Sequence, residues 1–395
     1  MTRHLLGSRP GRLVLPVILL LVVPTAMVAL GGPASAAARQ VATPRLAASA
    51  GVPASFSPES LTYVSTSDGF VLGTVACGKR RCLQLWRTTN DGASWSAVPA
   101  PPAGALQPGA PPLRIRFADP KDGWVYSMLA GQQTPLGWVT HSGGTRWSPI
   151  SFPVRATPSS QLGIEDLEAA GGVVDAAVAV DAHVEILSSP VGSNAWRRTG
   201  GAYAIGAGPI PSGQLVLQGR SGWFVQVDRV VIRGARATPS GRWVTWRPPC
   251  TGAGGPVTLT APSPSELHAV CTEGVWTGTK ISVDLLSSHD GGTTFGPSHR
   301  VPASQAGLAA AASTSTVAVG TTSIARSSST AVLEMTFNGG ASWTPVYRRA
   351  GGGWLELGFT TPTQGVAIVS GANEARSTML RTTNGGRSWA PVRLR

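Results

Sequence analysis

Short runs in which apolar and small polar residues alternate fill the chain from about residue 60 onward, and Gly, Pro, Asn and Asp interrupt them. Such a period of two predicts β-strands with one buried face. The first stretch predicts strands over 61–64, 70–75, 84–87 and 95–98. No amphipathic helix is expected after residue 40, so the pattern predicts an all-β protein.

An aromatic residue also returns every 46–52 residues, directly after a turn rich in glycine and small polar residues. The clearest turn is Thr-Thr-Asn-Asp-Gly-Ala-Ser-Trp at 88–95. A repeat of this length predicts a repeat architecture. Seven four-stranded units predict a seven-bladed β-propeller with antiparallel blades. The seven aromatic anchors are Trp95, Trp147, Trp196, Trp243, Phe295, Trp343 and Trp389.

The residue types in these turns suit a structural role. Glycine tolerates the positive φ of a tight turn, and an Asn or Asp side chain accepts hydrogen bonds from backbone N–H groups inside the turn. The anchor then buries its ring between neighbouring blades, which contributes about 2–3 kcal/mol per blade. Because an active site is needed only once, the repetition argues against catalysis in the turns. We expect these structural roles at Asn90, Gly92, Gly144, Asp290, Gly292, Asn338, Gly340, Asn384 and Gly386.

The turn resembles the Asp-box (BNR) repeat, whose pattern is Ser/Thr-x-Asp-x-Gly-x-Thr/Ser-Trp/Phe. Residues 288–295 match it in full, Asn replaces the Asp at 90, 338 and 384, and the copies around Val191 and Thr238 have lost it. The resemblance covers residues 60–395 and implies a β-propeller. The pairing of a Gly-Trp strand with such a turn is also similar to propellers of the photosystem II assembly-factor family, and Asp boxes occur in sialidases.

The N-terminus has the composition of an export signal. Basic residues precede an apolar stretch over 13–30, and an Ala-Ser-Ala cleavage site ends at Ala36. We predict a signal peptide over 1–36, an Ala/Pro/Ser-rich tether over 37–58 and the propeller over 59–395. The alternative is an uncleaved segment that tethers the protein to the membrane, because the apolar stretch has 18 residues.

Four cysteines fit an oxidising exterior and predict two disulfides, Cys77–Cys82 and Cys250–Cys271, although four cysteines allow three pairings. None of the histidines stands at ligand spacing to a cysteine pair. We therefore expect neither a metal site nor a cofactor.

The chain is strongly basic, with a net charge of +13. Such a charge attracts anionic polymers and membranes, whereas the alternative is genome composition, since Ala, Gly, Arg and Pro are all abundant. The charge does not gather into runs, so nucleic-acid binding is not expected. Lys79, Arg80 and Arg81 lie together inside the predicted Cys77–Cys82 ring and form a candidate docking site for an anion or an acidic protein. The alternative is a stapled loop with solvated charges.

Candidate sites for chemistry are few. Glu165, Asp166 and Glu168 form the densest acidic cluster, which is a candidate source of a hydrolase carboxylate or, alternatively, a solvated start of a blade. The segment 100–112 is expected to be a spacer, with a recognition arm as the alternative. Four further tryptophans are candidates for stacking on sugars, with packing at blade edges as the alternative: Trp86, Trp138, Trp246 and Trp354.

We therefore predict an exported, monomeric, non-catalytic propeller that acts as a binding or assembly module at the cell envelope or outside the cell. Its expected partner is a protein or an anionic envelope polymer. The alternative is a sialidase-like or endoglucanase-like glycoside hydrolase. Sialidases have six blades, and residues 114–117 only echo their Phe-Arg-Ile-Pro motif. Two carboxylates, or a tyrosine with three arginines, converging at the channel mouth would favour the hydrolase.

Overall fold

The computed structural model describes residues 51–106, 113–127, 136–155, 157, 160, 162–204, 212–228, 231–250, 257–273, 282–303, 305–325, 328–371 and 376–394. The predicted signal peptide and residues 37–50 of the predicted tether lie outside the described residues, as do residues 107–112 of the predicted spacer. The chain divides into two compact units, Met1–Ala47 and Ala48–Arg395, and all described residues belong to the second. Among them, no helix is long and apolar enough to cross a membrane.

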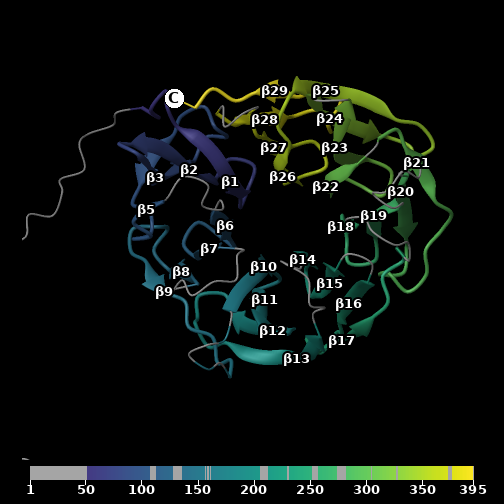
Figure 1. The fold of residues 1–395 in the computed structure, drawn as a ribbon, viewed down its shortest axis with the longest axis horizontal. Coiled ribbons are helices and arrows are strands. Elements are labelled where there is room, and N and C mark those ends of the chain that lie inside the picture. The colour runs from purple at the N-terminus through teal and green to yellow at the C-terminus, as the bar shows by residue number, and fades with distance from the viewer. Residues whose placement is uncertain are drawn as a thin grey trace, which may run out of the picture. The chain divides into compact units, whose positions relative to one another are not determined.

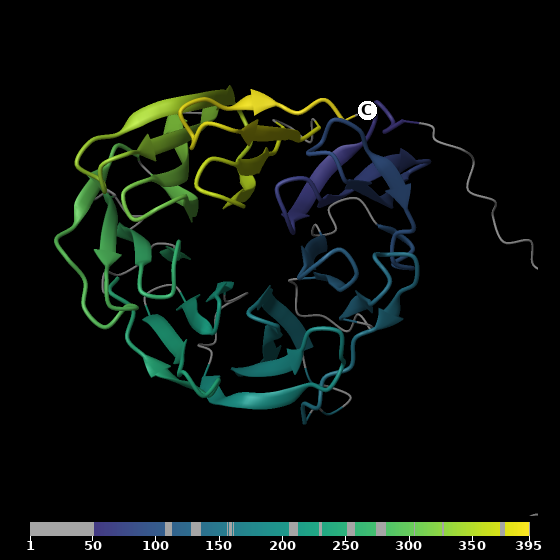
Figure 2. The ribbon, with the colours of Figure 1, turned by 180° about the vertical axis from the view of Figure 1, so that it is seen from behind.

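Seven antiparallel sheets stand in a ring, which confirms the predicted all-β, seven-bladed propeller (Figures 1 and 2). Blade 1 contains β1 (Ser57–Tyr63), β2 (Gly69–Cys77), β3 (Arg80–Thr88), β4 (Ser96–Val98) and a short β5 (Ala105–Leu106) that pairs with β3. Blade 2 contains β6 (Leu113–Phe117), β7 (Gly123–Ser127), β8 (Gly137–Thr140) and β9 (Ser148–Pro149). Blade 3 contains β10 (Leu162–Ala170), β11 (Val173–Val180), β12 (His183–Pro190) and β13 (Arg197–Ala204).

The remaining blades repeat this order. Blade 4 contains β14 (Ser212–Gln218), β15 (Ser221–Asp228), β16 (Val231–Ala237) and β17 (Trp243–Trp246). Blade 5 contains β18 (Val257–Thr260), β19 (Leu267–Glu273), β20 (Ser282–Ser288) and β21 (His299–Val301). Blade 6 contains β22 (Ala306–Ala311), β23 (Val317–Ala325), β24 (Ser328–Thr336) and β25 (Thr344–Ala350). Blade 7 contains β26 (Trp354–Phe359), β27 (Gly365–Val369), β28 (Thr378–Thr382) and β29 (Ala390–Pro391).

Within each blade the strands follow chain order from the centre of the ring outward, so β1, β6, β10, β14, β18, β22 and β26 line the channel (Figure 1). Because consecutive strands are antiparallel, the first and third turns of every blade lie at one end of the ring, the box-turn face. The second turn and the link to the next blade lie at the other end, the hairpin face. β1 begins at Ser57, two residues before the predicted start of the propeller.

The anchor aromatics lie between blades. Trp196 packs with residues of blade 2, Trp389 with residues of blade 6, and Trp95 joins blade 1 to residues of blade 7. Four anchors are 2–8% exposed, namely Trp95, Trp196, Trp243 and Trp389. The other three, Trp147, Phe295 and Trp343, are half-buried and contact the neighbouring core clusters. Hydrophobic burial therefore joins each blade to the blade before it.

The four further tryptophans also pack between blades. Trp86 and Trp138 are buried. Trp246 and Trp354 are half-buried, and their indole N–H groups donate to Gly292 O (2.8 Å) and Thr321 O (3.1 Å). Packing at the blade edge, rather than stacking on sugars, is the role that these contacts support.

Side-chain hydrogen bonds hold the complete turns. In blade 1, Thr88 Oγ1 accepts from Gly92 N (2.8 Å) and Asn90 Oδ1 accepts from Ser94 N (2.9 Å). The turns at Asn338 and Asn384 repeat both bonds, and Asp290 Oδ1 accepts from Thr294 N (2.8 Å) in blade 5. Asparagine thus keeps the acceptor role of aspartate. All five predicted turn glycines have positive φ: Gly92, Gly144, Gly292, Gly340 and Gly386.

The ring closes through side chains between blades 7 and 1. Gln364 Nε2 donates to Thr66 O (2.8 Å) and to Asp91 Oδ1 (2.6 Å), and Arg381 forms an ion pair with the same carboxylate. Asp91 has a φ of 61°, at a turn position where other blades have glycine. Each described blade consists of strands consecutive in the chain, so closure uses side-chain contacts rather than strand exchange.

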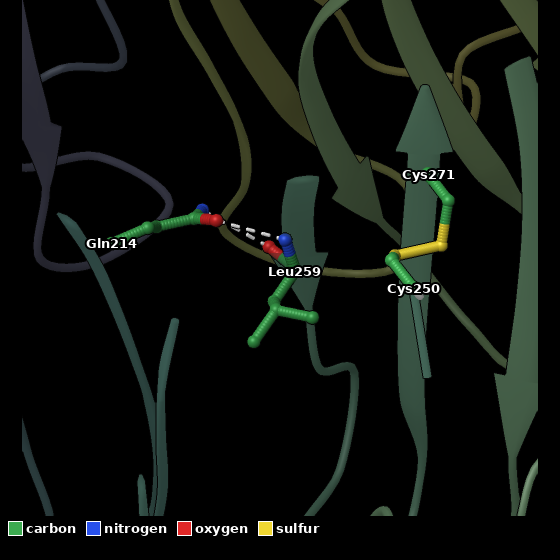
Figure 3. Close-up of a disulfide and its surroundings, with 4 residues drawn as sticks. All are labelled: Gln214, Cys250, Leu259 and Cys271. Atoms are coloured by element: carbon green, nitrogen blue, oxygen red, sulfur yellow. Dashed lines mark hydrogen bonds between the residues drawn. A yellow bond between two sulfur atoms is a disulfide. The ribbon is translucent and has the colours of Figure 1, made fainter. Parts of the chain in front are cut away.

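The two predicted disulfides, Cys77–Cys82 and Cys250–Cys271, are confirmed. The first closes the β2–β3 turn on the hairpin face. The second joins the end of blade 4 to β19 of blade 5, near the hydrogen bonds that link the inner strands of these blades (Figure 3).

Candidate functional site

β-Bulges on the inner strands decide which side chains face the channel wall. β1, β10, β22 and β26 each have a register irregularity at the same place, directly before Ser60, Asp166, Leu308 and Glu356. A bulge sets two residues opposite one and so interrupts the alternation of faces. Glu165 and Asp166, although consecutive, are therefore both buried, at 4% and 8% exposed.

Polar side chains connect one inner strand to the next. Ser60 Oγ accepts from Ile115 N (3.1 Å), and Asp166 Oδ2 accepts from Leu215 N (2.8 Å). Gln214 bridges β14 and β18 in both directions, since its Oε1 accepts from Leu259 N (2.8 Å) while its Nε2 donates to Leu259 O (3.1 Å) (Figure 3). These bonds satisfy backbone groups that would otherwise be unpaired at the inner edge of each blade.

Five charged side chains form what we call the inner-wall charge cluster: Arg114 and Arg116 of β6, Asp166 and Glu168 of β10, and Glu356 of β26. Arg114 Nη1 lies 2.9 Å from Glu356 Oε1, and Arg116 Nη1 lies 3.3 Å from the same oxygen. Arg116 Nε donates to Glu168 Oε1 at 2.6 Å. One guanidinium group therefore lies between two carboxylates from opposite sides of blade 2.

The pKa values of two carboxylates of this cluster are shifted in opposite directions. Burial raises the pKa of Glu168 to about 7, although Arg116 opposes the shift. Burial would also raise the pKa of Glu356, but Arg116 and Arg114 outweigh it and hold that pKa below its ordinary value. Near neutral pH, Glu356 is therefore ionised while Glu168 is partly protonated.

The other two acids of β10 are held by internal donors. Asp166 Oδ1 accepts from the Tyr126 hydroxyl (2.8 Å), and burial raises the Asp166 pKa. Glu165 Oε2 accepts from Gly213 N (3.1 Å), and burial raises the pKa of Glu165 to about 7. Tyr126 is completely buried, so its hydroxyl group is not presented to the channel.

The inner-wall charge cluster borders a channel cavity of about 390 Å³. The opposite side of this cavity is formed by β14, β18 and β22, whose described lining residues carry no charge. Gln214, Thr260 and Leu308 are half-buried members of that side. The cavity is thus polar and ionic along blades 7, 2 and 3, and neutral along blades 4, 5 and 6.

The sequence-predicted sites lie apart from one another. Lys79 and Arg80 are exposed on the hairpin face, whereas Arg81 turns back to pair with Glu59 (2.8 Å). The acidic segment 165–168 reaches the channel wall, so its interpretation as a solvated start of a blade is wrong; the bulge and the contacts with blades 2 and 4 bury it.

Sequence reasoning missed Arg114, Arg116 and Glu356 as a group, because they lie about 240 residues apart in the chain. The one available signal was the Arg-Ile-Arg-Phe segment at 114–117, whose alternation places both arginines on one side of β6. The described residues contain no group of three or more His, Cys, Asp or Glu side chains placed to hold a metal ion.

No family model and no curated protein matches the chain. Among solved structures, the chain is similar to YCF48 bound to D1 peptide, at 15% identity and a TM-score of 0.54, over 85% of this chain and 95% of that one. It is also similar to a polysaccharide lyase of family PL25, an ulvan lyase, at 10% identity and a TM-score of 0.52, over 86% and 96% of the two chains. A Mycobacterium tuberculosis puromycin-hydrolyzing peptidase matches at 13% identity and a TM-score of 0.51, over 86% of this chain and 53% of the other. At these identities the likeness shows the fold.

Proposed function

We propose that this protein is an exported, non-catalytic propeller whose channel cavity and hairpin face bind a segment of a partner protein. The observation that carries the proposal is that the acids of the channel wall already have internal partners. Glu356 accepts from Ser60 and two arginines, Asp166 accepts from Tyr126 and two backbone N–H groups, and Glu168 is paired with Arg116. Such groups stabilise the wall, and Glu356 and Asp166 have little bonding capacity left for a substrate.

The cavity has the mixed lining that suits a peptide. Two arginines and three carboxylates lie on one side, and Leu308 with neighbouring alanines lies on the other. A volume of about 390 Å³ lies within the usual range for ligand pockets. The solved structure of YCF48 bound to D1 peptide has a similar fold that holds a peptide, which supports the proposal at the level of the fold.

The compartment and the repeat family are part of the proposal. Two disulfides fit an extracytoplasmic protein, and residues 1–36 have the composition of a signal peptide. The hydrogen bonds at Asn90, Asp290, Asn338 and Asn384 support assigning the turns to the Asp-box repeat. N-terminal sequencing of the exported protein tests the signal, since cleavage after Ala36 is expected and an intact Met1 would establish an anchor instead.

Capture from the native envelope fraction, at low and moderate salt, tests the binding proposal. Leu308→Arg places a charge and extra volume in the cavity and should abolish capture, while Ser96→Arg on an outer strand should not. If Lys79 and Arg80 contribute, the double variant Lys79→Glu/Arg80→Glu should weaken capture most at low salt. The matched control is Lys121→Glu/Arg146→Glu, which makes the same charge change at exposed positions of the box-turn face. Equal capture by all four variants would contradict both sites.

A glycoside hydrolase is the second candidate, and one observation favours it. Glu168 and Glu356 border the same cavity with pKa values shifted in opposite directions, as acid and base partners of a glycosidase are. A panel of chromogenic glycosides should show no turnover under the binding proposal. Turnover that is lost in Glu168→Gln, and that follows a bell-shaped pH profile, would establish the hydrolase.

A further inference from the structure

The joint between blades 3 and 4 departs from the repeat in two independent ways. In blades 1, 2 and 4, an aromatic residue at the start of the second strand fills the gap to the next blade: Phe70, Trp124 and Trp223. Strand register places Asp175 at the same position in blade 3, opposite Ser188, just as Phe70 is opposite Arg87. A short carboxylate thus stands where three of the other six blades have a large ring. Blades 5, 6 and 7 have His268, Ala318 and Val366 at this position, so blade 3 alone has a carboxylate there.

The turn that should close this joint is also altered. In blades 2, 5, 6 and 7 the second turn glycine lies directly against the preceding blade; for example, a Cβ on Gly144 would meet Val98 at 2.6 Å, and a Cβ on Gly386 would meet Met335 at 2.3 Å. The turn of blade 4 lacks the Asp-box pattern, and within it Thr238 N donates to Arg242 O (2.8 Å). Among the described residues, no atom lies within 4 Å of a Cβ placed on Gly241.

These two departures leave a cavity of about 350 Å³ on the box-turn face, here named the blade 3–4 pocket. Its polar lining includes Asp175, Ser188, Thr199, Arg197 and Arg220, and Trp243 with two prolines forms its apolar wall. Asp175 is 5% exposed and accepts from the Ser188 hydroxyl and the Trp243 indole N–H. The Ser188 hydroxyl in turn lies 2.8 Å from Thr199 Oγ1.

The rim of the pocket is cationic. Arg197 and Arg220 are exposed, come from different blades, and form no ion pair with a carboxylate in the part of the chain that the structure describes. Arg220 follows Gly219, whose carbonyl lies against Gly171 of blade 3, so the turn that carries this arginine is fixed beside the pocket. Two unpaired guanidinium groups favour a ligand with a carboxylate, phosphate or sulfate group.

We propose that the blade 3–4 pocket binds an acidic sugar, a hydroxylated ring that carries a carboxylate, phosphate or sulfate group. The Ser188 and Thr199 hydroxyls, both half-buried, donate to or accept from the sugar hydroxyls, and Asp175 accepts from Ser188 and so orients its hydroxyl group. Pro190 and Pro239, both exposed, supply apolar surface for the C–H face of the ring, and the two arginines hold the acid group. This site is separate from the channel cavity and does not depend on the function proposed for it.

Titration of the full protein with glucuronate, glucose 6-phosphate and glucose 6-sulfate tests the inference, with glucose as the neutral comparison. We expect at least one acidic sugar to bind at millimolar concentration or better and glucose to bind at least tenfold more weakly, since charge-assisted bonds to arginine are lost. The three acidic sugars distinguish the acid group. Absence of binding by all three, or equal binding of glucose, would overturn the proposal.

Variants locate the site. Asp175→Phe restores the residue type of blades 1, 2 and 4 and should fill the pocket, so binding should be lost while the fold is kept. If that variant does not fold, Arg197→Gln and Arg220→Gln keep the test, because both side chains are exposed and each should weaken binding about tenfold. The matched control is Arg387→Gln in the turn of blade 7, which should bind as the wild type does. Unchanged binding in Arg197→Gln and Arg220→Gln would overturn the assignment of the pocket.

Discussion

The two halves of the channel wall perform one structural task with different chemistry. Around blades 7, 1, 2 and 3, inner strands are joined by the pairs that Glu356, Arg114 and Arg116 make. Around blades 4, 5 and 6, they are joined by neutral groups, the Gln214 amide and the Thr260 hydroxyl. Both halves satisfy backbone groups at the inner edges, so the ring geometry alone does not require charge. What differs is the response to salt and pH, which only the first half should show.

Replacing Glu356 should have the largest effect. Glu356→Gln leaves Arg114 and Arg116 without their shared counter-charge, and breaking a buried pair costs about 3–5 kcal/mol. Since the side chains are 11–20% exposed, we expect the free energy of unfolding to fall by about 3 kcal/mol. Urea denaturation measures it, with Glu273→Gln on an exposed position of β19 as the control. A loss below about 1 kcal/mol would show that solvent already screens the pair.

Replacing Gln214 should have a smaller effect that does not depend on salt. Gln214→Leu removes both hydrogen bonds to Leu259, which should cost about 1–2 kcal/mol. The same denaturation at low and high salt separates the two halves, because only the loss in Glu356→Gln should shrink with salt. An equal salt dependence of the two variants would remove the distinction.

Replacing Glu165 should change how stability depends on pH. Burial raises the Glu165 pKa from 4.5 to about 7, so its contribution to stability is complete below about pH 4.5 and is lost as the pH rises through 7. Glu165→Gln cannot ionise, so its stability relative to wild type should rise over that window. Unfolding measured from pH 4.5 to 8 tests this, and a constant difference would contradict it. Burial lowers the pKa of His268 to about 4, so this residue contributes a pH dependence of the opposite sign. That contribution is the same in the variant and the wild type, and it cancels when the two are compared.

The ring-closing carboxylate should give the smallest effect. Asp91→Gly relieves the positive φ but loses the pair with Arg381, and a pair whose members are 26% and 35% exposed contributes under about 1 kcal/mol. Asp91→Asn keeps an acceptor for Gln364 and loses only the charge. The free energy of unfolding of both variants should lie within about 1 kcal/mol of the wild-type value. A larger loss would show that the stability of the ring depends strongly on the contact between blades 7 and 1.

The sequence was sufficient for the fold because the repeat is local. An anchor such as Trp95 and a turn residue such as Asn90 lie within a few positions of each other, so their spacing can be recognised in the amino-acid sequence. Both disulfides were also predicted, since each closes a short stretch.

The channel wall was not predicted, for a physical reason. Arg114 and Glu356 meet only when the ring closes, and Asp166 faces the wall only because a bulge shifts the alternation of β10. A bulge has no strong signal in one sequence. Asp175 likewise could not be singled out from the sequence, because only the strand register shows that it occupies the position of Phe70 and Trp124 in other blades.

Self-contained sheets have a consequence for the order of the chain. Where a propeller shares a strand between its first and last blades, its polypeptide must start and stop inside one sheet. Here each sheet is made of consecutive strands, and the side chains of Gln364, Arg381 and Asp91 connect blade 7 to blade 1. Side chains also connect the remaining pairs of neighbouring blades. A circular permutant opened at another link between blades, with residues 57 and 394 joined by a flexible peptide, should therefore fold into the same seven-bladed propeller, with a different blade at its N-terminus.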